Sequence, residues 1–136
     1  MIFLFLHSTW RWVVLLTLTG AIARMARGRR GGVPFSPLDN AIRHWTATVT
    51  HVQLVLGVTL FVRNPVADRF RLIHMAGMTL AVTVITIGSA MAKRRAHDAD
   101  RFATAFRWFL AGLVIILLLV PWPFSPLAQR PYFRNF

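Results

Sequence analysis

The sequence contains neither cysteine nor glutamate, and it has only four acidic residues against 16 Lys and Arg. Without cysteine there is no disulfide, no thiolate metal site and no cysteine nucleophile. We expect all four acidic residues to lie in loops, and they are Asp39, Asp68, Asp98 and Asp100. The apolar part of the chain then has no carboxylate of its own, which excludes a carboxylate pair for acid–base catalysis.

Long apolar runs dominate what is present. More than half of the 136 residues are hydrophobic, and mean hydropathy is +0.55. The runs approach the roughly 20 residues that cross a hydrocarbon core. We therefore predict an all-α integral membrane four-helix bundle, forming one domain over residues 1–136. The expected spans are 2–23, 41–62, 72–92 and 102–120, followed by a Pro- and aromatic-rich tail, 121–136, at the outer interface or against a partner subunit.

The first apolar run is expected to be a helix of the mature protein. Its charges follow it, at Arg24, Arg27, Arg29 and Arg30, whereas a signal peptide carries them in front. We expect the next span to begin with an N-cap at Asp39 or Asn40.

The basic residues that produce the net charge of +12 flank the apolar runs. No soluble module remains that could bind nucleic acid. Because Lys and Arg are enriched in cytoplasmic loops, their distribution predicts up-down-up-down topology with both termini outside. Ten of them belong to the first and third connections, and five to the second connection and the tail. The ten are Arg24, Arg27, Arg29, Arg30, Arg43, Lys93, Arg94, Arg95, Arg101 and Arg107; the five are Arg63, Arg69, Arg71, Arg130 and Arg134.

Three histidines fall within the spans, and their depths decide which of them can act together. At 1.5 Å per residue, His7 and His74 lie roughly 5 to 8 Å below the outer boundary, whereas His51 lies about 18 Å from the outer end of its span. An iron porphyrin with two histidine ligands requires both at nearly the same depth. We therefore expect that a b-type haem, if bound, is held by His7 and His74.

Arg11 and His51 leave several alternatives open. A cation among apolar residues usually has a partner. For Arg11 the candidates are a haem propionate, a lipid phosphate, a carboxylate of another subunit or Asp68, or the side chain reaches outward between Trp10 and Trp12. His51 could be a haem ligand if its helix is shifted outward, a quinone contact or a polar clasp between helices.

Small residues follow His74 at helical spacing, at Gly77, Ala81 and Gly88. Such a face admits either a flat macrocycle or a close neighbouring helix, and the helix is the more common occupant. Zinc would need about four closely placed ligands, and the histidines are too scattered in depth to supply them.

Several short segments resemble a family of small four-helix bacterial membrane proteins described as cytochrome b-like. They are LHSTWRWVVLL, THVQLVLGVTLFV, IHMAGMTLAVTVITIG and the PWPF exit. The resemblance implies electron transfer and points to His7, Arg11, His51 and His74. The chain departs from the two-haem type with ligand pairs at both membrane faces, because its fourth span has no histidine. At most one haem is therefore expected.

Two functional hypotheses follow. The first is an electron-transfer subunit of a larger respiratory or photosynthetic complex in the bacterial inner membrane, binding one haem b or contacting quinone and not catalytic on its own. The second is a cofactor-free accessory subunit that fills gaps between helices and binds lipid. Both hypotheses place the chain in a lipid bilayer with other subunits as partners, and neither involves nucleic acid.

Overall fold

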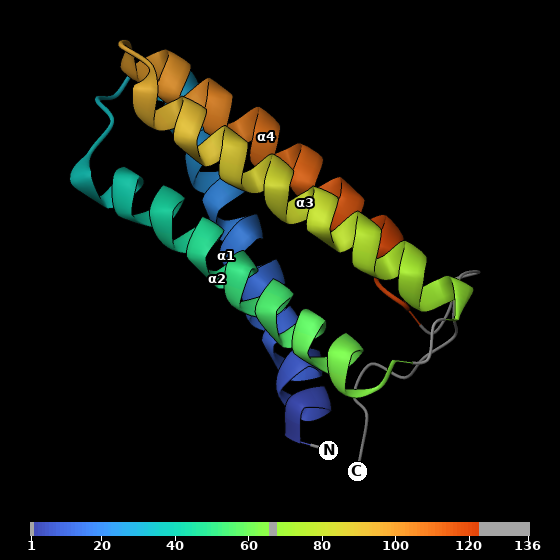
Figure 1. Ribbon diagram of the computed structural model, residues 1–136. Coiled ribbons are helices and arrows are strands. Elements are labelled where there is room, and N and C mark those ends of the chain that lie inside the picture. Colours follow the sequence, from blue (N-terminus) through green and yellow to red (C-terminus); the bar gives the residue numbers. More distant parts are fainter. Residues whose placement is uncertain (1, 66–67, 123–136) are drawn as a thin grey trace.

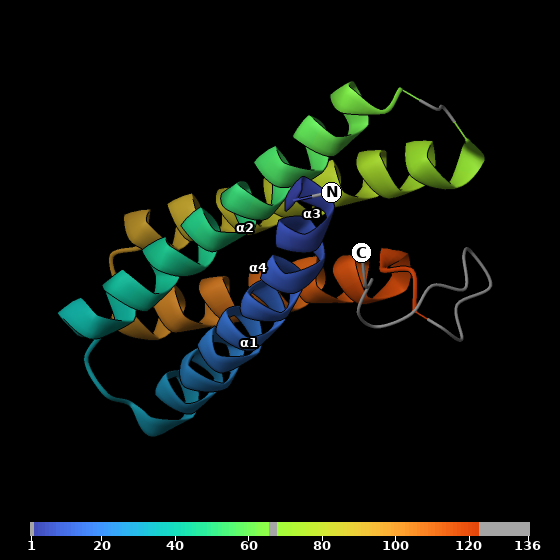
Figure 2. The ribbon, with the colours of Figure 1, turned by 90° about the horizontal axis from the view of Figure 1, so that it is seen from below.

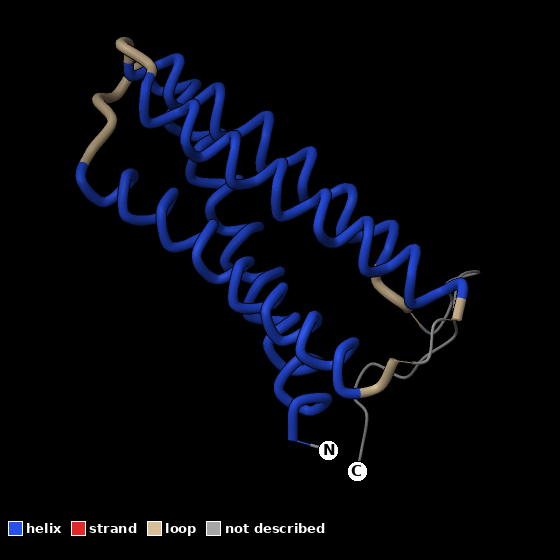
Figure 3. Tube along the Cα trace, viewed as in Figure 1, coloured by secondary structure: helices blue, strands red, loops and turns tan. Residues whose placement is uncertain are grey.

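The computed structural model describes residues 2–65 and 68–122, and every regular element in these ranges is an α-helix (Figure 3). Each of the four helices is long and apolar enough to cross a membrane. The helices are α1 (Ile2–Gly31), α2 (Pro37–Arg63), α3 (Arg69–Arg94) and α4 (Asp98–Leu119). The prediction of an all-helical chain with four helices able to cross a membrane is therefore confirmed. The predicted outer tail, 121–136, lies outside the described residues from 123 onward.

The helices extend beyond the predicted spans, most clearly at the end of α1. The basic segment 24–30 belongs to α1 rather than to the first connection. The helix continues because no proline interrupts it, and it ends where Gly32 takes a positive φ of 58° ahead of Pro34. The first cationic cluster is therefore carried on a rigid helix.

The predicted N-cap of α2 at Asp39 or Asn40 is wrong, because Ser36 is the N-cap. Pro37 occupies the first turn, and Asp39 stands at the third helical position, where it completes a capping box with Ser36. The Asp39 carboxylate also accepts a hydrogen bond from Arg24 Nε at 2.6 Å, and Asp39 is only 1% exposed. This buried aspartate ties the end of α1 to the start of α2.

The expectation that all four aspartates lie in loops is also incorrect. Asp98 and Asp100 belong to the first turn of α4, in addition to Asp39 in α2. Asp68 precedes α3 as its N-cap, and its side chain accepts from the backbone N–H of Arg71. Negative side chains are stabilised near a helix N-terminus, where the backbone N–H groups lack partners.

The four helices contact one another in a ring. α3 packs most extensively against α4, α1 contacts both α2 and α4, and α2 contacts α3. Figure 1 shows α3 and α4 running side by side and α1 crossing behind α2, and Figure 2 shows the bundle with the start of α1 toward the viewer. The fully buried side chains belong mainly to α1, α3 and α4, with Leu18, Met25, Ile85, Phe102 and Phe109 at their centre.

The small-residue face of α3 receives a neighbouring helix. A Cβ placed on Gly77 would collide with Leu119, and one placed on Gly88 would collide with Trp108. Both partners belong to α4. Of the two interpretations of this face, helix packing is the one that the structure supports.

Candidate functional site

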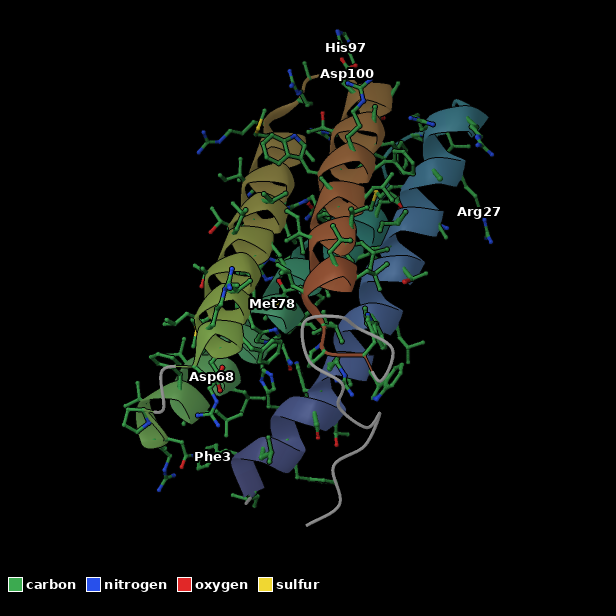
Figure 4. The ribbon with its side chains drawn as sticks, turned by 90° about the vertical axis from the view of Figure 1, so that its right-hand side faces the viewer. Phe3, Arg27, Asp68, Met78, His97 and Asp100 are labelled. Atoms are coloured by element: carbon green, nitrogen blue, oxygen red, sulfur yellow. The ribbon has the colours of Figure 1, made fainter. Side chains whose placement is uncertain are left out.

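A cavity of about 440 Å³ lies between the helices, and side chains from all four contribute to its wall. It reaches from Asn64 and Pro121, at the chain segments just beyond α2 and α4, to Val82 of α3. Figure 4 places one lining residue, Met78, midway along α3, between the labelled Asp68 and His97. The wall is mainly apolar, with polar side chains that include His7, Arg11, Gln53, Asn64, Arg71 and His74.

Three of the four predicted site residues, His7, Arg11 and His74, line this cavity. The ring centres of His7 and His74 are 6.5 Å apart, and their planes are inclined at 76°. The two histidines come from α1 and α3, which are not extensively packed neighbours. The structure thus brings together the two histidines whose depths match in the sequence.

His74 is oriented by the end of α4. Its Nδ1 lies 2.8 Å from the backbone oxygen of Leu119, the last residue of that helix. A carbonyl can only accept, so Nδ1 carries the proton and Nε2 carries the lone pair. Phe70 stacks on the same ring, with centres 5.5 Å apart. Metal-binding histidines commonly have this arrangement, with the second ring nitrogen donating to a carbonyl.

His7 is seated against α2. Gln53 Nε2 donates to the backbone oxygen of His7 at 3.0 Å and lies 3.5 Å from its ring Nε2. One turn further along α2, a Cβ on Gly57 would lie 3.2 Å from Cε1 of His7. Gln53 and Gly57 are functional candidates that the sequence reasoning missed. Their four-residue spacing on a helix was the available signal, because it places both on one face.

Two guanidinium groups contribute to the same wall. Arg11 lies one turn after His7 on α1, with its guanidinium 5.4 Å from the centre of the Trp12 ring. Arg71 of α3 contacts the Asp68 carboxylate at 3.4 Å and donates to the backbone oxygen of Asn64. Asp68, one of the partners considered for Arg11, is thus engaged with Arg71. The cavity combines two histidines with two cations.

His51 lies away from the cavity, on the exposed side of α2. Its Nε2 is 3.0 Å from Oγ1 of Thr86, whose own proton is donated to the backbone oxygen of Val82. His51 therefore donates to Thr86 and joins α2 to α3. Of the roles considered for His51, a polar contact between two helices is the one that matches this geometry.

The donor set restricts which metal centre the site can hold. Among the described residues, no cluster of three or more His, Cys, Asp or Glu side chains is placed to bind a metal ion. A porphyrin brings four nitrogen ligands of its own and requires only one or two from the protein. The pair His7 and His74 fits that requirement.

Comparisons of the chain with protein-family models, with curated proteins and with solved structures find no match. The resemblance to cytochrome b-like membrane proteins therefore stays a prediction.

Proposed function

We propose that this chain is a membrane electron-transfer subunit that binds one b-type haem through His7 and His74. The observation that carries the proposal is the 6.5 Å separation of their ring centres across a cavity. Two imidazoles on opposite sides of one metal have ring centres roughly 6 Å apart, since each metal–nitrogen bond is about 2 Å. The Nδ1 contact of His74 with Leu119 adds support, because it leaves Nε2 as the ligating atom.

Residues of this chain would position the haem in the cavity. The apolar wall would exclude water and lower the local dielectric, and both conditions tune the reduction potential of a bound haem. The haem itself would supply reversible one-electron transfer at its iron. Arg11 and Arg71 would hold the propionate groups, or a lipid phosphate at the same mouth. An anion there offsets the cost of placing two cations beside an apolar cavity.

The proposal includes up-down-up-down topology with both termini on the outer side of a bacterial inner membrane. The start of α1 lies beside the end of α2, since His7 contacts Gln53 and Arg63 lies 4.9 Å above the Phe3 ring. The ten-to-five distribution of Lys and Arg favours the cytoplasm for the α1–α2 and α3–α4 connections. The cavity then opens toward the outer side.

We also propose that other membrane subunits exchange electrons with this chain. The connections 32–36, 64–68 and 95–97 are too short to form a docking domain. A redox partner would therefore approach the haem at the outer mouth or through the lipid-facing sides of the helices. A quinone head group is the alternative occupant of the cavity, and the cofactor-free accessory subunit is the alternative if the cavity binds neither.

Paired histidine variants test the proposal. The protein is produced with ample haem, and its absorption spectrum is recorded after purification in detergent. His7→Ala and His74→Ala should each abolish the low-spin bis-histidine spectrum. His51→Ala is the matched control and should preserve it, because His51 is a helical histidine outside the cavity. Loss of the spectrum in His51→Ala with retention in His7→Ala would contradict the assignment.

A further inference from the structure

The contact between Gln53 and His7 has a fixed polarity. Gln53 Nε2 is 3.0 Å from the backbone oxygen of His7, and that oxygen can only accept. If the Gln53 amide were flipped, its Oε1 would face the backbone oxygen of His7, and two acceptors cannot share a hydrogen bond. The orientation of the Gln53 amide is therefore determined. The same Nε2 lies 3.5 Å from Nε2 of His7, where a ring nitrogen with a lone pair is favoured. The His7 proton is then expected on Nδ1.

Each of the two side chains keeps one buried polar atom without a partner among the described residues. These atoms are Nδ1 of His7 and Oε1 of Gln53. With the proton on Nδ1, His7 offers a donor and Oε1 of Gln53 an acceptor. The two side chains are already in contact. Buried polar atoms are strongly disfavoured when unsatisfied. A hydrogen bond between these two atoms, formed by rotating the ring and the amide, would satisfy both at once.

We propose that Gln53 is the positioning residue of His7. Its amide nitrogen anchors the backbone of α1, and its amide oxygen accepts from Nδ1–H when Nε2 turns toward a ligand in the cavity. Gly57 completes the seat, because a Cβ at that position would lie 3.2 Å from Cε1 and 3.6 Å from Nδ1. The role of Gln53 toward haem rests on the proposed function, whereas its choice of tautomer does not.

The two histidines are thus oriented by different kinds of group. His74 donates to the backbone oxygen of Leu119, which no substitution of that residue removes. His7 depends on a side chain, so its basicity can change with a single substitution. A carboxylate in place of the Gln53 amide would accept more strongly from Nδ1–H and make the imidazole a stronger electron donor. The reduction potential of a bound haem should then fall.

The first test uses the whole protein without haem in lipid bilayers, with ¹⁵N-labelled histidine followed by NMR. Wild-type His7 should show the Nδ1–H tautomer. Gln53→Met preserves the side-chain length and removes both polar atoms, so the His7 signal should shift toward the Nε2–H tautomer. Gln53→Glu replaces the amide donor with an acceptor, so in the protein without haem it should also shift His7 toward Nε2–H. Thr86→Val is the control, because it removes the partner of His51 and leaves Gln53 intact.

An unchanged His7 tautomer in Gln53→Met would overturn the proposal, provided that circular dichroism reports the same helix content. If Gln53→Met does not fold, Gln53→Glu decides alone: a shift toward Nε2–H supports the proposal, and an unchanged Nδ1–H tautomer contradicts it. These readouts need no haem, so they remain decisive even if the wild-type protein binds none.

The second test measures haem retention and reduction potential. Removing a group that orients a metal-binding histidine typically weakens metal affinity by about 10–100-fold. Gln53→Met should therefore release haem about 10–100-fold more readily, and Gln53→Glu should retain it at a lower potential. Equal affinity and equal potential in all three proteins would contradict a positioning role. Absence of haem from the wild type would instead overturn the proposed function.

Discussion

The backbone oxygen of Leu119 lies 2.8 Å from Nδ1 of His74, so the last residue of α4 orients a histidine of α3. The final carbonyls of a helix lack intrahelical partners. Here one of them accepts from an imidazole that faces the cavity. The contact depends on how closely α4 approaches α3, and Gly77 sets that approach.

Enlarging Gly77 should therefore disturb the site from outside it. In Gly77→Ala the new methyl group would collide with a terminal methyl group of Leu119, so Leu119 must shift beside His74. We expect a lower thermal unfolding midpoint and a loss of haem affinity of about tenfold or more, as for other groups that orient a metal-binding histidine. Equilibrium haem titration in detergent measures the affinity.

Gly20→Ala provides the matched control, since a Cβ at Gly20 of α1 meets nothing within 4 Å. Alanine is also the better helix former, so this variant should be at least as stable as the wild type. If Gly77→Ala and Gly20→Ala bound haem equally well, the approach of α4 would not control His74.

Asp39→Asn should destabilise the protein without altering the cavity. The carboxylate completes the capping box with Ser36 and accepts from Arg24 while almost fully buried. Loss of a hydrogen-bonded charged group at a helix start costs about 1–3 kcal/mol. The free energy of unfolding in detergent should fall by that amount, with the haem spectrum unchanged.

Asp98→Asn is the control for Asp39. Asp98 contacts Arg101 at 3.5 Å, and its side chain is 40% exposed. Surface ion pairs contribute about 0–1 kcal/mol. Equal losses of stability in Asp39→Asn and Asp98→Asn would contradict the role assigned to the buried aspartate.

Arg11→Leu should weaken anion or haem retention and leave insertion into the membrane intact. The substitution removes a cation from the cavity wall and makes α1 more apolar, so the helix should insert at least as readily. Arg63→Leu tests whether any outer cation has the same effect, because Arg63 does not line the cavity. Equal haem affinity in Arg11→Leu and the wild type would exclude a propionate contact for Arg11.

Much of the fold was predictable because hydropathy alone determines where a chain can cross a bilayer. The pairing of His7 with His74 was predictable for a similar reason, since depth follows from residue counting along a helix. The N-cap of α2 was misplaced although SPLD matches the capping-box pattern. Ser36 and Asp39 are both residue types that cap helices, and the structure has Ser36 as the cap with Asp39 bonded back to it.

Gln53, Gly57 and Leu119 were not predictable in their observed roles. Residue counting gives depth but not the rotation of one helix about its axis relative to another. Gln53 and Gly57 face His7 only because α2 turns that side toward α1. Leu119 contacts His74 through its backbone oxygen. Every residue has this atom, so the amino-acid pattern cannot predict the contact.

The most direct test of the central claim is the reduced-minus-oxidised absorption spectrum of wild-type protein produced with ample haem, combined with a haem assay per polypeptide. The account predicts a low-spin b-type spectrum with close to one haem per chain. Protein that is folded and helical by circular dichroism yet shows no Soret band would contradict it.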